Sequence, residues 1–353
     1  WYNIDQIFYG WSSWTACFDG VELSRAEVRQ VNYSELFPQV DLDVTQSSII
    51  RTLDMAYYPA ERGTNNYDDD FGADGKYIDP EDRWAGMTRA LSTTNFQQAN
   101  IEYVQFWLMD PYENYSIQPD EGGLASPPGL QDMQGELYFN FGNISEDILR
   151  DDRKMFENGL PIDGDQIPGS NIESTPWSSI PTDQSLLYAF PESDEARLNQ
   201  DLGLDGINDE DETIKYGAVF GDDPSADNFH YFRGSDYDVE DASILTRYKE
   251  FSLTEGNSPT INNSVESYPT SSTTFPDVED INKDQTMSAI ESYYQYKVSL
   301  NKTDLIVGKN NIVDKRVTTV QLANNTTQTT TWYQFRIPIT TPEDPANIIN
   351  DMA

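Results

Sequence analysis

The stretch that decides the fold class is IEYVQFWL, residues 101–108. Alternate side chains of a β-strand point to opposite faces of its sheet, so Ile101 and Tyr103 share one face while Val104 and Phe106 share the other. Both faces are largely apolar. A short apolar run of this kind is typical of a strand that lies inside a β-sandwich.

A second stretch, GELYFNF at residues 135–141, alternates more strictly. Leu137, Phe139 and Phe141 share one face and polar side chains occupy the other, which is the pattern of a half-buried strand. Two further predicted strands, rich in β-branched and aromatic residues, are Ile49–Tyr58 and Thr330–Ile339. We therefore predict a mainly β protein, built as a jelly-roll or galactose-binding-like β-sandwich.

Long acidic loops separate the predicted strands, and the predicted helices are few and short. The predicted loops are Gly63–Asp82, Pro111–Gln134 and Asn158–Pro181, and the predicted helices are Ser145–Phe156, Asp183–Ala189, Asp238–Phe251 and Ser288–Tyr296. The low-complexity tract Thr318–Thr331 predicts a loop or a hairpin. We expect one β-rich segment over residues 1–353. If it divides, a sandwich core at 1–160 precedes a loop-rich, calcium-binding part with closing strands at 161–353.

The charge balance restricts the partners of the chain. The 61 Asp and Glu residues outnumber the 22 Lys and Arg residues, which gives a formal net charge of −39. Such a charge repels phosphate backbones, so we expect no nucleic-acid partner. The aromatic fraction of 12% is too high for a disordered acidic tail, so a folded protein carries this charge.

Residues for nucleophilic or zinc-based catalysis are scarce. Cys17 is the only cysteine and His230 the only histidine, so the sequence offers neither an internal disulfide nor a histidine-based triad. No nucleophile elbow, phosphate loop or dinucleotide fingerprint occurs. We expect no enzyme activity, and we expect both residues to have packing or surface roles. No run of 18 apolar residues occurs, so no membrane-spanning helix is predicted. We expect the chain to be a portion of a longer protein.

The sharpest motif is DINKDQTMSAIE, residues 280–291. Oxygen ligands at the first, third, fifth, seventh, ninth and twelfth positions wrap around Ca²⁺ in loops of this spacing. The predicted ligands are Asp280, Asn282, Asp284, Thr286 through its carbonyl, Ser288 and Glu291. Gln285 stands where such loops carry a glycine with positive φ, and Glu291 is expected to begin a helix. The alternative is an exposed acidic turn that caps a helix.

A second motif is DLGLDGINDEDE, residues 201–212, which resembles the short Asp-rich loops of thrombospondin-type calcium repeats. The predicted Ca²⁺ ligands are Asp201, Asp205, Asp209 and Glu212. Carboxylates this close repel one another, and a divalent cation relieves that repulsion. Two weaker candidates are Asp68–Gly75 and Asp222–Asn228, which solvated turns explain equally well. In a chain with one cysteine, we expect calcium to take the stabilising role that disulfides have elsewhere.

Several phrases together resemble the SprA (Sov) family, the outer-membrane translocons of the Bacteroidota type IX secretion system. They are LDMAYYPAERG (53–63), PEDRWAGMTRAL (80–91), NIEYVQFWLMDP (100–111), GELYFNFGNISEDI (135–148), FENGLP (156–161), NQDLGLDG (199–206), DPSADNF (223–229) and WYQFRIP (332–338). They keep the family's order and cover roughly residues 4–339. Each phrase is weak alone, and the set is specific.

The resemblance implies a very large outer-membrane β-barrel that serves protein export and gliding motility. This chain would be a soluble domain inserted in, or extending from, that barrel and capping its pore. The implied partners are the rest of the barrel, a PorV-like shuttle protein, a periplasmic plug protein and secreted cargo proteins. The family offers no catalytic residues. The expected location is the outer membrane, on the extracellular face or alternatively the periplasmic one.

A calcium-dependent carbohydrate-binding or adhesive cell-surface module is the alternative function. Exposed aromatic rings stack on sugars, and the sequence has aromatic loops at Trp11–Trp14 and Tyr112–Tyr115. Sugar binding by the chain would favour this alternative over a scaffold.

Overall fold

The fold is described from a computed structural model of the chain. The described residues are 2–10, 18, 20–63, 68, 70–93, 95–112, 135–149, 152–154, 172–174, 179–182, 209–217, 220–226, 228, 230–249, 251 and 278–340.

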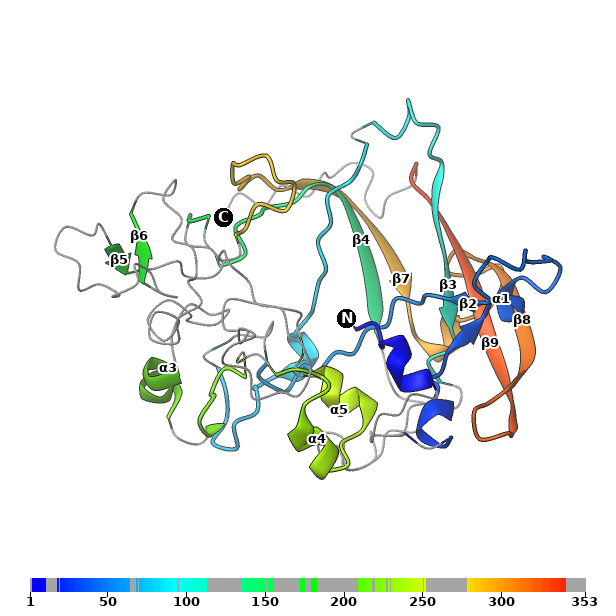
Figure 1. Ribbon diagram of the computed structural model, residues 1–353. Helices are drawn as coiled ribbons and strands as arrows, with labels where there is room; N and C mark the ends of the chain where they lie inside the picture. The colour runs from blue at the N-terminus through cyan, green and yellow to red at the C-terminus, as the bar shows by residue number, and fades with distance from the viewer. Residues whose placement is uncertain are drawn as a thin grey trace.

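Nine strands and four α-helices are described (Figure 1). The strands are β1 (Val31–Asn32), β2 (Ile49–Ile50), β3 (Tyr103–Met109), β4 (Glu136–Asn143), β5 (Ile172–Ser174), β6 (Ser179–Pro181), β7 (Ser292–Ser299), β8 (Ile312–Gln321) and β9 (Thr327–Pro338). The helices are α1 (Tyr33–Leu36), α3 (Asp209–Tyr216), α4 (Ser235–Val239) and α5 (Ile244–Lys249), and four single-turn 3₁₀ helices lie at Gln6–Tyr9, Glu22–Ser24, Pro80–Asp82 and Lys302–Asp304. The mainly β prediction is confirmed.

The main core lies between two antiparallel sheets. One sheet has the order β3-β9-β8 and the other pairs β4 with β7. Val298 and Tyr296 of β7 are buried against Phe335 and Ile337 of β9. The predicted inner face of β4 packs against the same cluster, because Leu137, Phe139 and Phe141 are all among its neighbours.

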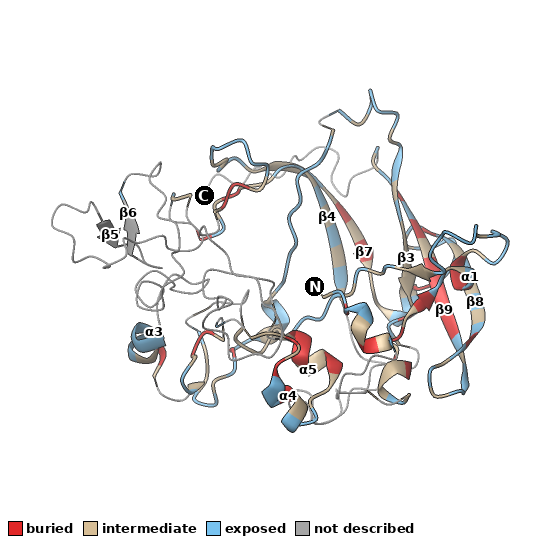
Figure 2. Cartoon of the chain, viewed as in Figure 1, coloured by how far each residue is buried: buried red, intermediate tan, exposed pale blue. Residues whose placement is uncertain are grey.

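Strand β9 is the middle strand of its sheet, and its residues 330–333 are buried on both faces (Figure 2). Phe335 has no exposed surface, and its ring stacks on Phe106 of β3 with centroids 4.8 Å apart. On the opposite face, Trp332 forms a smaller cluster with Val31 and Leu36 from the β1–α1 segment. The N-terminal segment therefore covers the other face of the β3-β9-β8 sheet.

A separate helical cluster joins the N-terminus to α4 and α5. Phe8 packs there with Phe232, Ile244 and Tyr248, and the rings of Phe232 and Tyr248 stack 4.9 Å apart. The predicted helix Asp238–Phe251 is thus partly confirmed, because the chain forms two short helices with a break between them.

Three other local predictions have definite outcomes. The predicted helix Ser288–Tyr296 is wrong, because Ser292–Ser299 is strand β7 and pairs with β4 along its length. In the described part of Ser145–Phe156 the backbone is not helical. The tract Thr318–Thr331 is a hairpin, because β8 and β9 pair across a turn closed by Leu322 and Thr326. Asp183–Ala189 lies outside the described residues.

The predicted strand Ile49–Tyr58 is confirmed only at its start. Ile49 and Ile50 form β2, and beyond them the isolated bridge between Asp54 and Tyr2 is the one described pairing of this stretch. Within the described residues, no helix has the length and apolar character needed to cross a membrane.

Candidate metal centre

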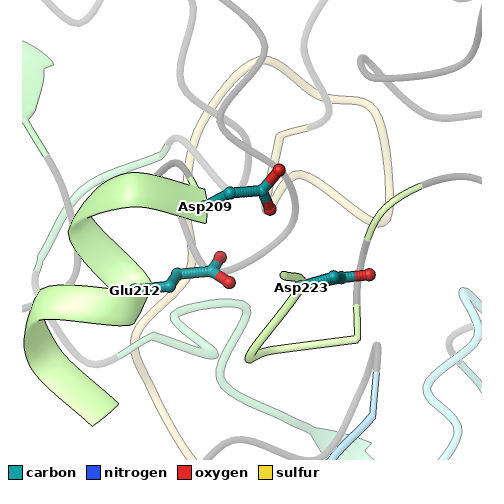
Figure 3. A group of neighbouring side chains, drawn as sticks. All are labelled: Asp209, Glu212 and Asp223. Atoms are coloured by element: carbon teal, nitrogen blue, oxygen red, sulfur yellow. The ribbon is translucent and has the colours of Figure 1, made fainter. Parts of the chain in front are cut away.

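Three carboxylates converge where α3 meets the loop at residues 222–226. Oxygens of Asp209, Glu212 and Asp223 lie within 4.8 Å of one another, and within the described ranges no other group of three or more acidic, histidine or cysteine side chains does so. Figure 3 shows Asp209 and Glu212 projecting from one side of α3 toward the loop that carries Asp223. The i, i+3 spacing on a helix places the first two on the same face.

Hydrogen bonds fix the orientation of these carboxylates. Glu212 is 1% exposed, and its Oε2 accepts the amide of Ser225 at 3.0 Å. Asn228 binds the other two, because its side-chain amide donates to Asp209 at 2.9 Å and its backbone amide donates to Asp223 at 3.3 Å. Carboxylates held this close repel one another, and hard oxygen ligands of this kind are what Ca²⁺ prefers.

Arg62 supports the loop from a distant part of the chain. Its Nε donates to the carbonyl of Pro224 at 2.8 Å and its Nη2 donates to the hydroxyl of Ser225 at 3.2 Å. Its guanidinium lies 3.7 Å from the ring centroid of Tyr216, at the end of α3. Arg62 therefore joins the two elements that carry the acidic group, and the sequence motifs did not indicate it.

Side-chain-to-backbone hydrogen bonds hold the first half of the loop at residues 280–291, although its acidic side chains do not converge. The two carboxylate oxygens of Asp280 accept the amides of Asp284 and Gln285, at 3.0 and 2.7 Å. Asn282 also accepts from Asp284, at 2.8 Å. Hydrogen bonds that the side chain and backbone of Thr286 donate to Asp284 lower the pKa of that carboxyl. The first half of the loop is thus folded around its oxygen atoms.

The second half of this loop differs from the prediction. Glu291 directly precedes strand β7 rather than beginning a helix. Asp280, Asp284 and Glu291 do not form a group of three within the 4.8 Å limit. Lys154 lies 3.6 Å from Asp280 and supplies a positive charge beside the first predicted ligand.

Buried glutamates connect the loop to the segment after β4. Glu146 accepts the amides of Ile281 and Asn282 with one oxygen, at 3.1 and 3.2 Å, and the amide of Ser288 with the other, at 2.9 Å. In return, Glu279 accepts the amides of Ile148 and Leu149, each at 2.8 Å. Two carboxylates from two distant segments therefore satisfy five backbone donors and set the position of the loop.

Gln285 adopts the positive φ that the motif requires, at 70°. A left-handed conformation costs a residue with a Cβ roughly 1–2 kcal/mol, and glycine avoids this cost. We therefore expect Gln285→Gly to raise the free energy of unfolding by up to about 1 kcal/mol, because glycine's greater unfolded-state freedom offsets part of the gain. Gln285→Ala keeps the Cβ and should give no such gain. Denaturant unfolding of both variants tests this, and equal effects would contradict it.

The remaining predicted site residues fall into two groups. Asp201 and Asp205 lie outside the described residues, as do Cys17 and most of both aromatic loops. The weaker candidate Asp222–Asn228 contributes Asp223 to the acidic group. The other weaker candidate is Asp68–Gly75. Asp68 forms an ion pair with Arg83 at 2.7 Å, and the described carboxylates of this stretch do not form a group of three.

His230 takes part in a local contact at the start of α4. Its Nε2 lies 2.7 Å from the carboxylate of Asp236, and its ring packs on Tyr237 with centroids 4.1 Å apart. These contacts fix the turn before α4.

A known family model matches part of the second half of the chain. Residues 207–351 match the SprA_N family model, described as a motility related/secretion protein. The match covers less than half of the 353 residues, and it includes β7–β9, the acidic group and the loop at 280–291. It confirms the resemblance seen in the sequence, so the chain is a SprA-like fragment with a motility- or secretion-related role. No curated protein matches the chain.

Proposed function

We propose that this SprA-like chain is a structural cap or scaffold of an outer-membrane secretion translocon, and that it acts through its shape rather than by catalysis. The match of residues 207–351 to a motility and secretion family carries the proposal. The translocon as a whole would export folded cargo and serve gliding motility. This chain would brace or cover its pore.

The connectivity of the sandwich supports a bracing role. Strands β3 and β4 come from residues 103–143, whereas β7–β9 come from residues 292–338, and the main core needs both groups. A sandwich closed by such distant segments fixes the points at which the intervening chain leaves β4 and enters β7. We propose a jelly-roll-like unit inserted between, or extending from, the strands of a large barrel.

The charge supports a location that meets divalent cations. A formal net charge of −39 is best tolerated where calcium is abundant, so we place the chain on the outer face of the outer membrane, with the periplasmic face as the alternative. The proposed partners are the rest of the barrel, a PorV-like shuttle protein, a plug protein and the secreted cargo.

Calcium is the proposed cofactor, with a stabilising role. The first proposed site is the group Asp209, Glu212 and Asp223, where three carboxylates lie within 4.8 Å. The second is the loop that begins at Asp280, where the backbone already has the turn of a calcium loop. A cation at the first site would join α3 to the 222–226 loop, in addition to the contacts of Arg62.

A secretion assay on the intact protein in its native cells tests the scaffold role. Phe335→Ala removes a core side chain from the sandwich, and Val317→Ala changes an exposed side chain on the neighbouring strand β8. We expect the first variant to reach the outer membrane and lose most cargo export and gliding, and the second to keep both.

Limited proteolysis of the same cells provides the control on folding. If the sandwich of the Phe335→Ala protein is cleaved and export nevertheless continues at the wild-type rate, the scaffold proposal is wrong. Specific binding of the intact protein to glycans would instead support the carbohydrate-binding alternative.

A further inference from the structure

The turn between β7 and β8, residues 300–311, has an exposed tip that contributes to neither the sandwich core nor the acidic group. Ile306 and Val307 are neighbours at this tip, and each is 49% exposed. Leu305, directly before them, is buried in the main core and ties the turn to it. A single exposed aliphatic residue is common, so the meaning of this adjacent pair depends on the charges and the backbone around it.

Charge distinguishes this region from the rest of the chain. Residues 292–340 contain six Lys and Arg residues and two Asp residues, whereas the whole chain has 22 Lys and Arg and 61 Asp and Glu. Lys302 and Lys309 lie on either side of the aliphatic pair, both are exposed, and neither forms an ion pair within the described residues. Asp314, by contrast, lies 3.8 Å from Arg316. The turn is therefore a locally positive site on a strongly negative chain.

Distance limits the effect of the chain's negative charge on this site. In Figure 1, β8 lies at one end of the molecule, whereas α3, which carries two members of the acidic group, lies at the other. Exposed charges that are separated by more than roughly 8 Å are largely screened at physiological ionic strength. A surface that meets the turn therefore experiences its lysines rather than the net charge of −39.

The backbone of the turn is held by hydrogen bonds of its own. The amide of Ile306 donates to the carbonyl of Asp304 at 2.9 Å, and the amide of Lys309 donates to the carbonyl of Ile306 at 3.0 Å. Asn310 joins the turn to the end of β7, because its side chain accepts the amide of Ser299 at 2.9 Å and donates to the carbonyl of Ser299 at 2.6 Å. An added β-strand would need free backbone groups, whereas contact with lipid favours a backbone that is satisfied internally.

These three features match a lipid surface. Aliphatic side chains enter the boundary between head groups and acyl chains, and lysines beside them extend to lipid phosphates. Charge complementarity selects an anionic surface. We propose that the turn at residues 300–311 binds phosphate-bearing anionic lipid, with Ile306 and Val307 at the acyl boundary and Lys302 and Lys309 at the phosphates. The proposal depends neither on calcium nor on the capping role.

Photo-crosslinking of the intact protein, reconstituted in vesicles of phosphatidylethanolamine and phosphatidylglycerol, tests this contact. A photoreactive amino acid at Val307 should form adducts whose mass identifies phospholipid. Val239 is the matched control position, because it is 88% exposed on α4 but lies between Asp238 and Glu240. It should form roughly tenfold fewer lipid adducts, because its neighbours are acidic. Equal lipid yields at both positions would overturn the proposal. Adducts of Val307 to polypeptide alone would also overturn it, in favour of a protein partner.

Lipid composition tests the role of charge on the same protein. Replacing phosphatidylglycerol with phosphatidylcholine removes the anionic lipid, and the lipid adducts at Val307 should then fall by about tenfold. This comparison needs no further substitution, so it does not depend on the folding of another variant. An unchanged yield would overturn the proposal, because the lysines would then play no part in the contact.

Two charge-matched pairs of substitutions test the lysines directly. Lys302→Gln with Lys309→Gln should lower the yield in anionic vesicles by about tenfold, because each lysine near such a surface strengthens binding about fivefold. Arg51→Gln with Lys76→Gln removes the same charge from exposed positions elsewhere and should keep the yield. Near-UV circular dichroism should match wild type for both pairs, because all four side chains are exposed. Equal losses in the two pairs would overturn the proposal in favour of a general effect of net charge.

Discussion

Phe335→Ala should lower the free energy of unfolding by about 3–5 kcal/mol, the usual cost of truncating a buried phenylalanine. Phe335 has no exposed surface, and it stacks on Phe106 in the same sheet while its cluster packs against β4 and β7. Its loss leaves a cavity between the two sheets. Since the free energy of unfolding of a domain is only about 5–15 kcal/mol, this single change removes a large part of it.

Denaturant unfolding, followed by near-UV circular dichroism, measures this effect. Val317→Ala is the matched control, because it truncates a side chain of the same sheet that is 57% exposed. The control should lose less than about 1 kcal/mol. If both variants unfold at the same denaturant concentration, the core does not lie where the two sheets meet.

Strands with strong local patterns could be predicted from the sequence. Residues 101–108 are apolar on both faces and form β3 beside the central strand, and the strict alternation of 135–141 produced β4. Strand β8 was recognised only as part of a low-complexity tract, because Asp314, Lys315 and Arg316 interrupt its apolar pattern. Its pairing with β9 extends back to Ile312, beyond the start of the tract in which a hairpin was predicted.

The misassigned helix at 288–296 has a tertiary cause. Strand β7 contains Tyr293, Tyr294 and Tyr296, which favour a strand, but the preceding calcium motif suggested the helix that follows the loop in other proteins. Pairing of β7 with β4 decides the outcome, because Tyr296 and Phe139 meet across the ladder. Local spacing could not reveal a partner about 150 residues away.

The candidate metal centre was only half visible in the sequence. Asp209 and Glu212 belong to one predicted motif, and Asp223 belongs to a weaker one that was considered separately. The fold brings them together because α3 lies next to the 222–226 loop and Arg62 contacts both. Acidic spacing can indicate a ligand, but the third carboxylate of this group depends on tertiary structure.

Calcium should raise the midpoint of thermal unfolding, and the group Asp209, Glu212 and Asp223 should account for much of the rise. A ligand that binds only the folded state adds about 2.7 kcal/mol when present at 100 times its dissociation constant. For a domain of this size class we expect a rise of roughly 5 °C or more between chelator and calcium. The rise should shrink in acid, because carboxylate ligands must be deprotonated.

Two variants and one control separate this centre from the general effect of charge. Asp223→Asn replaces one carboxylate oxygen of the group with an amide nitrogen and removes its negative charge, so it should abolish most of the calcium-dependent rise. Glu210→Gln removes the same charge from an exposed position on the same helix, next to Asp209, and should keep the rise. Because each protein is compared with itself in calcium and in chelator, calcium-independent changes in stability cancel. Equal loss in both variants would mean that calcium screens the acidic surface without a defined site. A full rise in Asp223→Asn that disappears in Asp280→Asn would place the stabilising ion in the 280–291 loop instead.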